Sequence, residues 1–192
     1  MDRMDDGPEF ETLRLRLRRW SDADLEPFAA FNADPVVMRC FPKTLDRNES
    51  DALAARWRNM FRERGFGMWA VEVKGGAPFI GFVGLSVPLY EAHFTPCVET
   101  GWVLGAPYWG KGYATEAATV ALGFGFDVLG LAEIVAYTAA INRRSQAVME
   151  RLGMQRSPAD DFQHPLLPAE HTLRAHMLYR IGSDEYHENT SA

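Results

Sequence analysis

Cysteine is scarce in this sequence, which has only Cys40 and Cys97 among its 192 residues. The two residues show neither the close spacing of a zinc site nor the repeated pattern of a disulfide framework. We therefore expect no metal site and no structural disulfide, and a reducing compartment, the cytoplasm, is the simplest interpretation.

An excess of basic residues is also missing. The 20 lysines and arginines are outnumbered by 26 aspartates and glutamates, which gives a formal net charge of −6. Because a nucleic-acid-binding protein of the usual kind presents a basic face to the phosphate backbone, we expect no nucleic-acid partner.

Long apolar runs are absent as well. Residues 117–141 are mostly apolar, but Asp127 and Glu133 interrupt them before they reach membrane-spanning length. The first ten residues, MDRMDDGPEF, are acidic and lack the apolar centre of a secretory signal. We therefore expect a soluble protein with no membrane partner.

The chain does contain enough apolar residues for one well-filled core, since 47% of its residues are hydrophobic. We expect a single domain over residues 12–182. Polar ends should flank it, as a flexible arm over residues 1–11 and a flexible tail over residues 183–192.

An alternating pattern predicts the first strand. In LRLRLRRW, which starts at Leu13, leucines alternate with Arg14, Arg16 and Arg18, as in a half-buried strand. The row of arginines is expected to face solvent, and the alternative is that it faces an acidic substrate.

The remaining elements follow from periodicity and from glycines. SDAD, from Ser21, begins a helix with a weak capping box, and Gly65 or Gly67 ends a second, amphipathic helix. Two alternating runs joined through Gly75 and Gly76 predict a hairpin. Further strands are expected in CVETGWVL, EIVAYTA and TLRAHMLYRI, and helices in TEAATVALGFGFDVLGL and NRRSQAVMERLGM. This order predicts an α/β (α+β) fold whose mixed sheet is antiparallel early and parallel later.

Residues 109–115, which we call the glycine loop, join an expected strand to an expected helix. Gly110 and Gly112 lie where the helix begins, and the unpaired N–H groups of a first helical turn attract anions such as phosphate. The loop lacks the Gly-Lys-Ser/Thr of a Walker loop and the third glycine of a dinucleotide-binding loop. It is therefore either an anion site or only a tight connection.

The segment VETGWVLGAPYWGKGYATEA, followed by YTAAINRRSQAVMERLGM, resembles the acyl-CoA-binding half of the GNAT superfamily of N-acetyltransferases, and looks most like its RimJ/RimL branch. The family pattern Gln/Arg-x-x-Gly-x-Gly/Ala falls on residues 109–114, with Trp109 in place of the polar first residue. The resemblance continues from LRLRLRRW through GFVGL to Asn142-x-x-Ser145 and LGM. It implies a mixed, mostly antiparallel central sheet with splayed parallel strands, flanked by helices.

The resemblance also implies acetyl-CoA as co-substrate and no metal. The pyrophosphate of coenzyme A suits the N–H groups of the glycine loop, where Gly112 and Ala114 keep side chains out of its path. The pantetheine arm is expected to pair with a strand edge at residues 102–104. Asn142 either contributes to this site or only caps its helix. The cofactor-binding residues so predicted are Trp102, Val103, Leu104, Trp109, Gly110, Lys111, Gly112, Tyr113, Ala114, Thr115, Asn142 and Ser145.

Acetyl transfer to an amine needs a deprotonated amine, stabilisation of an oxyanion and a proton for the departing thiolate. Glu99 is the predicted base, and the alternative is a solvent-facing or arginine-paired carboxylate. Ser145 is predicted to protonate or hydrogen-bond the leaving sulfur, unless it is an ordinary first-turn serine. Tyr113 and Tyr137 could replace it as acids. A backbone N–H near residues 103–104 is expected to bind the oxyanion.

Cys97 invites an acetyl-cysteine mechanism, which we reject because no histidine lies near it in the sequence. His164, His171 and His176 are expected to line or border the acceptor pocket. We predict an acyltransferase that moves acetyl by direct transfer in a ternary complex to a primary amine, on a protein N-terminus or a small molecule. It would act as a monomer or homodimer. The alternative is a GNAT-like module that binds acyl-CoA as a sensor without catalysis.

Overall fold

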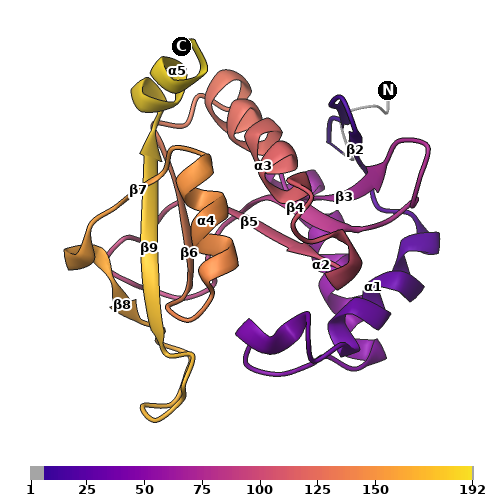
Figure 1. Cartoon of the computed structure of the whole chain (residues 1–192), viewed down its shortest axis with the longest axis horizontal. Helices are drawn as coiled ribbons and strands as arrows, with labels where there is room; N and C mark the ends of the chain where they lie inside the picture. The colour runs from indigo at the N-terminus through magenta and orange to yellow at the C-terminus, as the bar shows by residue number, and fades with distance from the viewer. Residues whose placement is uncertain (1–6, 192) are drawn as a thin grey trace.

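One mixed sheet organises the protein, of which the computed structural model describes residues 7–191 (Figure 1). The strands follow the order β1-β2-β3-β4-β5-β6-β9-β7, and β8 pairs with β9. Their bounds are β1 Phe10–Glu11, β2 Leu15–Arg18, β3 Met68–Val73, β4 Gly81–Ser86, β5 Glu99–Leu104, β6 Glu133–Ala139, β7 Gln155–Arg156, β8 Phe162–Gln163 and β9 Ala175–Gly182. Among the described strands, β5 and β6 form the one parallel pair. The predicted mixed, mostly antiparallel sheet is confirmed.

Helices flank this sheet. Their bounds are α1 Leu25–Ala33, α2 Arg47–Arg64, α3 Tyr113–Gly123, α4 Arg143–Arg151 and α5 Ser183–Ser191. Helix α1 packs on α2, which contacts β3, while α3 contacts β2, β4, β5 and α4. Figure 1 shows α1 and α2 grouped near β3 and β4, and α4 beside β6. None of the helices within residues 7–191 has the length and apolar character needed to cross a membrane.

The two faces of β6 carry separate buried clusters. Ile134 and Ala136 belong to the main core, whereas Val135 lies in a smaller cluster with Phe94 and Leu178. Because successive side chains of a strand point to opposite faces, the small cluster lies on the face of β6 that is turned away from the main core. This second face carries the predicted base, as described below.

The leucines of the first strand are buried as predicted. Leu15 and Leu17 have no exposed surface, because their side chains enter the main core. Leu13 lies before the start of β2 and is 92% exposed, so the strand is shorter than the alternating pattern suggests.

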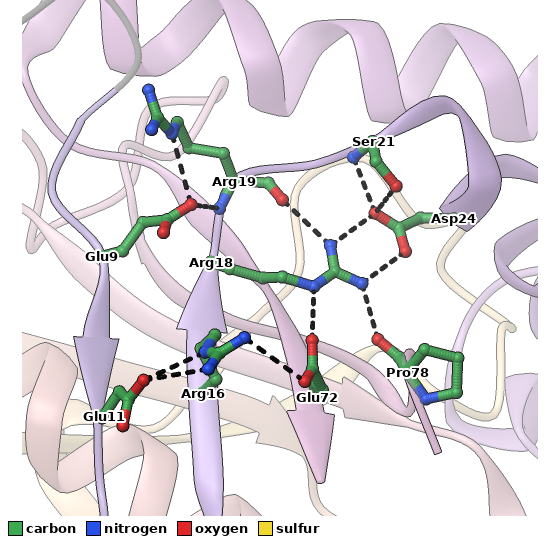
Figure 2. A network of polar contacts seen from close by, with 9 residues as sticks. All are labelled: Glu9, Glu11, Arg16, Arg18, Arg19, Ser21, Asp24, Glu72 and Pro78. Atoms are coloured by element: carbon green, nitrogen blue, oxygen red, sulfur yellow. Dashed lines mark hydrogen bonds and ion pairs between the residues drawn. The ribbon is translucent and has the colours of Figure 1, made fainter. Parts of the chain in front are cut away.

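The arginines of β2 contact carboxylates of the chain itself. Arg16 lies 3.1 Å from Glu11 and 3.6 Å from Glu72. Arg18 pairs with Asp24 at 2.7 Å and with Glu72 at 3.1 Å (Figure 2). Internal ion pairs therefore engage these two residues, and the alternative of an acidic substrate for them has no support.

Local signals set the helix ends. Ser21 and Asp24 form the expected capping box at a short turn that leads into α1. Asp46 and Glu49 form another at the start of α2. Gly65 ends α2 in the left-handed conformation, with φ of 74°, which glycine adopts without the penalty that a Cβ would bring.

The N-terminal segment carries more structure than expected. Strand β1 lies inside the predicted arm, and the ring of Phe10 is 5.5 Å from that of Trp69 and 5.6 Å from that of Phe124. Burial of this ring anchors the strand to the core. Residues 1–6 of the predicted arm lie outside the described residues.

The C-terminal segment likewise forms helix α5 over most of the predicted tail. The ring of Tyr186 lies 4.9 Å from that of Phe126, and His187 Nε2 lies 2.8 Å from the carboxylate of Asp127. These contacts fasten α5 to the segment that follows α3. Ala192 lies outside the described residues.

Candidate active site

Strands β5 and β6 separate soon after they meet. Their parallel pairing is confined to Glu99 opposite Val135, although β5 continues to Leu104 and β6 to Ala139. The N–H of Val135 donates to the carbonyl of Val98 at 3.0 Å, so the backbone of Val98 faces β6. Backbone groups alternate along a strand, and those of Trp102 therefore face the same side, where β6 no longer pairs with β5.

The same alternation shows which backbone groups of the predicted strand edge, residues 102–104, face β4 and which face the gap. Gly105 N–H donates to the carbonyl of Ile80 on the β4 side, which puts the N–H of Val103 on that side too. The N–H of Leu104 faces the gap between β5 and β6. The Leu104 carbonyl accepts a hydrogen bond of 2.8 Å from Trp109 Nε1. Of the two backbone positions considered for the oxyanion, Leu104 is the one that faces this gap.

The glycine loop begins helix α3 at the same end of β5. Gly110 and Gly112 have φ of 73° and 81°, and Gly112 is the N-cap of α3. A Cβ at Gly112 would lie 3.3 Å from Arg14 Nη2, whereas a Cβ at Gly110 would have no neighbour within 4 Å. Both positions need glycine for their left-handed backbone. The first-turn N–H groups of α3, which have no partner within the helix, are left available to an anion.

Arg14 braces this loop from the first strand region. Its Nη1 donates to the carbonyl of Lys111 at 2.9 Å, and its Nη2 lies 2.6 Å from Glu116. Glu116 also accepts from the hydroxyl of Thr12 at 2.5 Å. The first arginine of the alternating row therefore positions the glycine loop.

Two arginine side chains lie against the ring of Trp109, at the position where the family pattern has a polar residue. The guanidinium of Arg144 lies 4.4 Å from the centre of its ring, and that of Arg39 lies 5.5 Å away. Cations are attracted to the face of an indole ring. Neither arginine was predicted from the sequence, and nothing local in the sequence connects Arg39 to a loop 70 residues later.

Asn142 is the N-cap of α4, at the end of β6 beyond the separation. Its Oδ1 accepts from the N–H of Ser145 at 3.3 Å. Its Nδ2 donates to Ser145 Oγ at 3.0 Å and to Thr138 Oγ1 at 2.9 Å. The helix-cap interpretation of Asn142 is correct in geometry, and the same residue also fixes the hydroxyl of Ser145.

Glu99 lies on the second face of the sheet. The residue as a whole is partly buried, but its carboxyl group is surrounded by protein, and this burial raises its pKa. Hydrogen bonds from the hydroxyls of Ser86 and Tyr137 and the charge of Arg56 oppose the increase without cancelling it. Glu99 is neither solvent-facing nor directly paired with an arginine in the described structure.

An aromatic cluster adjoins Glu99 on this face. It consists of Tyr90, Phe94, Tyr137, Phe162, His164 and His176. The rings of His164 and His176 are 4.8 Å apart, and burial lowers the pKa of His176 to about 4. Burial also lowers the pKa of His164, so both rings are neutral at pH 7. His171 lies in the turn before β9, where its Nδ1 accepts from the N–H of Leu173 at 3.1 Å.

A pocket of about 370 Å³ opens beside this cluster in the loop between β4 and β5. Its lining residues are Val87, Pro88, Tyr90, Glu91, Ala92, Thr95, Pro96 and Cys97. Burial raises the pKa of the Cys97 thiol to about 11, and the nearby charge of Glu99 adds to the effect. Cys97 is thus a protonated thiol at neutral pH, whereas the thiolate is the nucleophilic form. Within residues 7–191, no three His, Cys, Asp or Glu residues are arranged to hold a metal ion.

Comparison with known proteins supports this arrangement of strands and loop. Residues 14–155 match the family model described as "Acetyltransferase (GNAT) domain". The chain is 32% identical over 149 residues to an uncharacterized protein, YkkB, of Bacillus subtilis, covering 76% of this chain and 84% of the relative. It is 31% identical over 154 residues to FsC-acetyl coenzyme A-N(2)-transacetylase of Aspergillus fumigatus, covering 77% of this chain and 65% of that protein.

A solved structure agrees with the sequence relatives. An acetyltransferase from Agrobacterium tumefaciens superposes with a TM-score of 0.73 at 28% identity, over 91% of this chain and 94% of that one. The family match covers most of the chain and includes both the separated strands and the glycine loop. The chain belongs to the GNAT family of acetyltransferases and is an acyltransferase enzyme.

Proposed function

We propose that this enzyme transfers acetyl from acetyl-CoA to the nitrogen of a primary amine, directly and within a ternary complex. The observation that carries the proposal is the gap between β5 and β6, which ends at the first turn of α3. The name of the Aspergillus relative, which includes both acetyl coenzyme A and a nitrogen position, supports a nitrogen acceptor. Acetyl-CoA, when bound, supplies the acetyl group as a thioester.

The residues on both sides of the gap fit coenzyme A. The N–H groups from Gly110 to Thr115 would hold the pyrophosphate, since Gly112 begins the first turn of α3 and has no side chain to block a ligand. The gap-facing backbone of Trp102 would pair with the amides of the pantetheine arm. Arg39 and Arg144 place two positive charges at Trp109, which favours the phosphate groups of the cofactor.

Glu99 would accept the proton that the amine loses. An α-amino group has a pKa of about 8 and a lysine amine one of about 10.4, so each is mostly protonated at pH 7. Burial raises the pKa of Glu99, which makes its ionised form a stronger base than an ordinary carboxylate. Below that pKa the carboxyl is protonated and cannot accept, and the rate should fall as the solution becomes more acidic.

Ser145 would assist departure of the thiolate. Asn142 holds its hydroxyl at the end of β6, and a fixed hydroxyl can hydrogen-bond a developing negative charge without reorganising. The gap-facing N–H of Leu104 would bind the oxyanion. The protonated state of the Cys97 thiol argues against an acetyl-cysteine intermediate.

A screen of amines tests the proposal. Acetyl-CoA is incubated with the enzyme and with polyamines, aminoglycosides, or peptides that have a free N-terminus, and the released thiol is followed. Turnover with one class identifies the acceptor. Tight binding of coenzyme A by calorimetry, with no thiol release for any class, would favour the acyl-CoA sensor instead. Membership of the RimJ/RimL branch, a cytoplasmic location and a monomeric or dimeric state remain predictions.

A further inference from the structure

Three neighbouring strands bring their side chains together at Glu99. Ser86 on β4 lies directly opposite Glu99 in the antiparallel register, and Val135 on β6 lies opposite it in the parallel register. Residues that pair across strands share a face of the sheet, and Tyr137 follows Val135 by two positions. Ser86, Glu99 and Tyr137 therefore occupy one face, side by side across β4, β5 and β6.

The Glu99 carboxyl is met by hydroxyl groups from both neighbouring strands. Ser86 Oγ donates to Glu99 Oε1, and the hydroxyl of Tyr137 is also hydrogen-bonded to the carboxyl. The positive charge of Arg56 on α2 also acts on it and lowers its pKa. The loop between β4 and β5 adds Tyr90 and Cys97, and both are neutral at pH 7 because burial raises the pKa of each.

Tyr90 packs against the ring of Tyr137. The centres of the two rings are 6.0 Å apart, and the ring planes meet at 70°. The Tyr90 oxygen is buried and makes no hydrogen bond of ordinary geometry within residues 7–191, although the Tyr137 hydroxyl lies near it. Its ring lines the pocket described above.

We propose that Tyr137 is a positioning residue for acetyl transfer, which holds the Glu99 carboxylate ionised and oriented toward the acceptor, and that the ring of Tyr90 supports Tyr137 by packing against it. The proposal rests on the proposed role of Glu99 as base. A hydroxyl that donates to a carboxylate favours its charged form, and it therefore counteracts the effect of burial. Without this donor, Glu99 would be protonated over more of the working pH range.

On this proposal Tyr137 acts as a hydrogen-bond donor to Glu99 and not as the acid for the thiolate. Burial raises the pKa of Tyr137, and the adjacent charge of Glu99 raises it further. The phenol thus keeps its proton and remains a hydrogen-bond donor throughout the reaction. It acts on the carboxylate and not on the leaving thiolate.

The pH dependence of kcat for Tyr137→Phe tests this role. The substitution keeps the ring and removes only the hydroxyl, so the acidic limb of kcat should move to higher pH. At a pH below that limb, kcat should fall by roughly tenfold, because a hydrogen bond to a charged group contributes about one such factor. The KM for acetyl-CoA should stay as in the wild type. Tyr90→Ala, which removes the ring that packs against Tyr137, should move the limb in the same direction by less.

Tyr186→Phe is the matched control, since the same atom is removed from a ring that packs on Phe126 of the main core, whereas Glu99 lies on the second face of the sheet. An unchanged acidic limb in folded Tyr137→Phe would overturn the proposal, provided that Glu99→Gln abolishes the limb. If Glu99→Gln also leaves the profile unchanged, the proposed base itself is wrong. Should Tyr137→Phe fail to fold, Tyr90→Ala decides: a limb at higher pH supports the proposal, and a wild-type limb contradicts it.

Discussion

Asp24 and Glu99 are both acidic residues with little access to water, yet their surroundings have opposite effects. Asp24 is 2% exposed and accepts from Arg18 at 2.7 and 2.8 Å and from the N–H of Ser21 at 2.7 Å (Figure 2). Burial favours its protonated form, but the hydrogen bonds of Arg18 and Ser21 outweigh burial and lower its pKa. Burial prevails at Glu99 and raises its pKa.

The number and charge of the donors explain the difference. The guanidinium of Arg18 donates to Asp24, to Glu72 and to the carbonyls of Arg19 and Pro78, so the network in Figure 2 is closely paired. Glu99 receives neutral hydroxyl donors, and the charge of Arg56 acts on it without an ion pair in the described structure. A fully paired carboxylate stabilises the fold, whereas an incompletely paired one retains affinity for a proton.

The largest effect should follow from breaking the paired region. Arg18→Ala leaves Asp24 buried without its cation, and the free energy of unfolding should fall by about 3–5 kcal/mol. Denaturant unfolding at pH 7 measures the loss. Arg16→Ala is the control, because its partners are more exposed and the pair should contribute less than about 1 kcal/mol. Equal losses for the two variants would show that Asp24 is not the reason.

The wild-type stability should also depend on pH through Asp24. Its lowered pKa means that its contribution is present above the ordinary value of 3.8 and is lost as the pH falls through the value in the folded state. Arg18→Ala should remove this part of the acid dependence. Unfolding curves measured from pH 7 down to pH 3 would reveal it.

Glu99→Gln should produce the opposite result, a loss of rate without a loss of stability. We expect kcat to fall by about 100-fold near pH 6 and to recover at high pH, where the free amine accumulates. Ionising a group whose pKa is raised by folding costs stability above its ordinary value, so the neutral amide should leave the melting temperature unchanged or higher at pH 8. If Glu99→Gln is less stable than the wild type, Glu99 stabilises the fold as Asp24 does, and the contrast between the two residues is wrong.

Gly112→Val should weaken the binding of coenzyme A at the glycine loop. Its side chain would enter the space beside Arg14 and strain a backbone with φ of 81°, so affinity for coenzyme A should fall by about tenfold. Calorimetry measures the affinity. Gly130→Val supplies a matched control, since Gly130 has φ of 66° and no neighbour within 4 Å of a Cβ, and it lies beyond the C-terminal end of the helix that the loop begins. Similar affinity in the two folded variants would contradict the assignment.

The smallest effect is expected at Ser145. Ser145→Ala should reduce kcat by about three- to tenfold and leave the affinity for coenzyme A nearly unchanged, because the hydroxyl matters most as the thiolate leaves.

Cys97→Ala should turn over at nearly the wild-type rate. Parallel double-reciprocal plots with an acetylated Cys97 trapped before amine is added would instead establish a covalent intermediate.

Local patterns were sufficient for most elements of the fold. The alternation around Leu15 and Leu17, the capping box at Ser21 and the stop at Gly65 each follow from a few adjacent residues, and the structure contains all of them. The glycine loop is local too, and its turn at Gly112 begins α3 as predicted. Strand β1 and helix α5 were not expected, because their sequences are mostly polar and the rings that anchor them, Phe10 and Tyr186, find their partners far away in the chain.

The partners of the candidate site depend on register and could not be predicted. Glu99 is a candidate base from its strand alone, but Ser86 reaches it only after a loop of twelve residues restores the pairing of β4 with β5. Tyr137 lies on the same face of the sheet as Glu99 because Glu99 pairs with Val135, two residues before Tyr137, in the parallel register. Arg39 meets Trp109 through packing between distant segments, and no periodic pattern reports such a contact.

The bond from Arg14 to the carbonyl of Lys111 joins residues 97 positions apart in the chain. Contacts of such sequence separation form late, since a long loop must close before they add any stability. Formation of the glycine loop and docking of the first strand region are therefore cooperative. A ligand that requires this shape would stabilise the whole fold by mass action, by about 2.7 kcal/mol at a concentration 100 times its Kd. Coenzyme A should therefore raise the melting temperature of Arg14→Ala by less than that of a variant altered elsewhere on the surface.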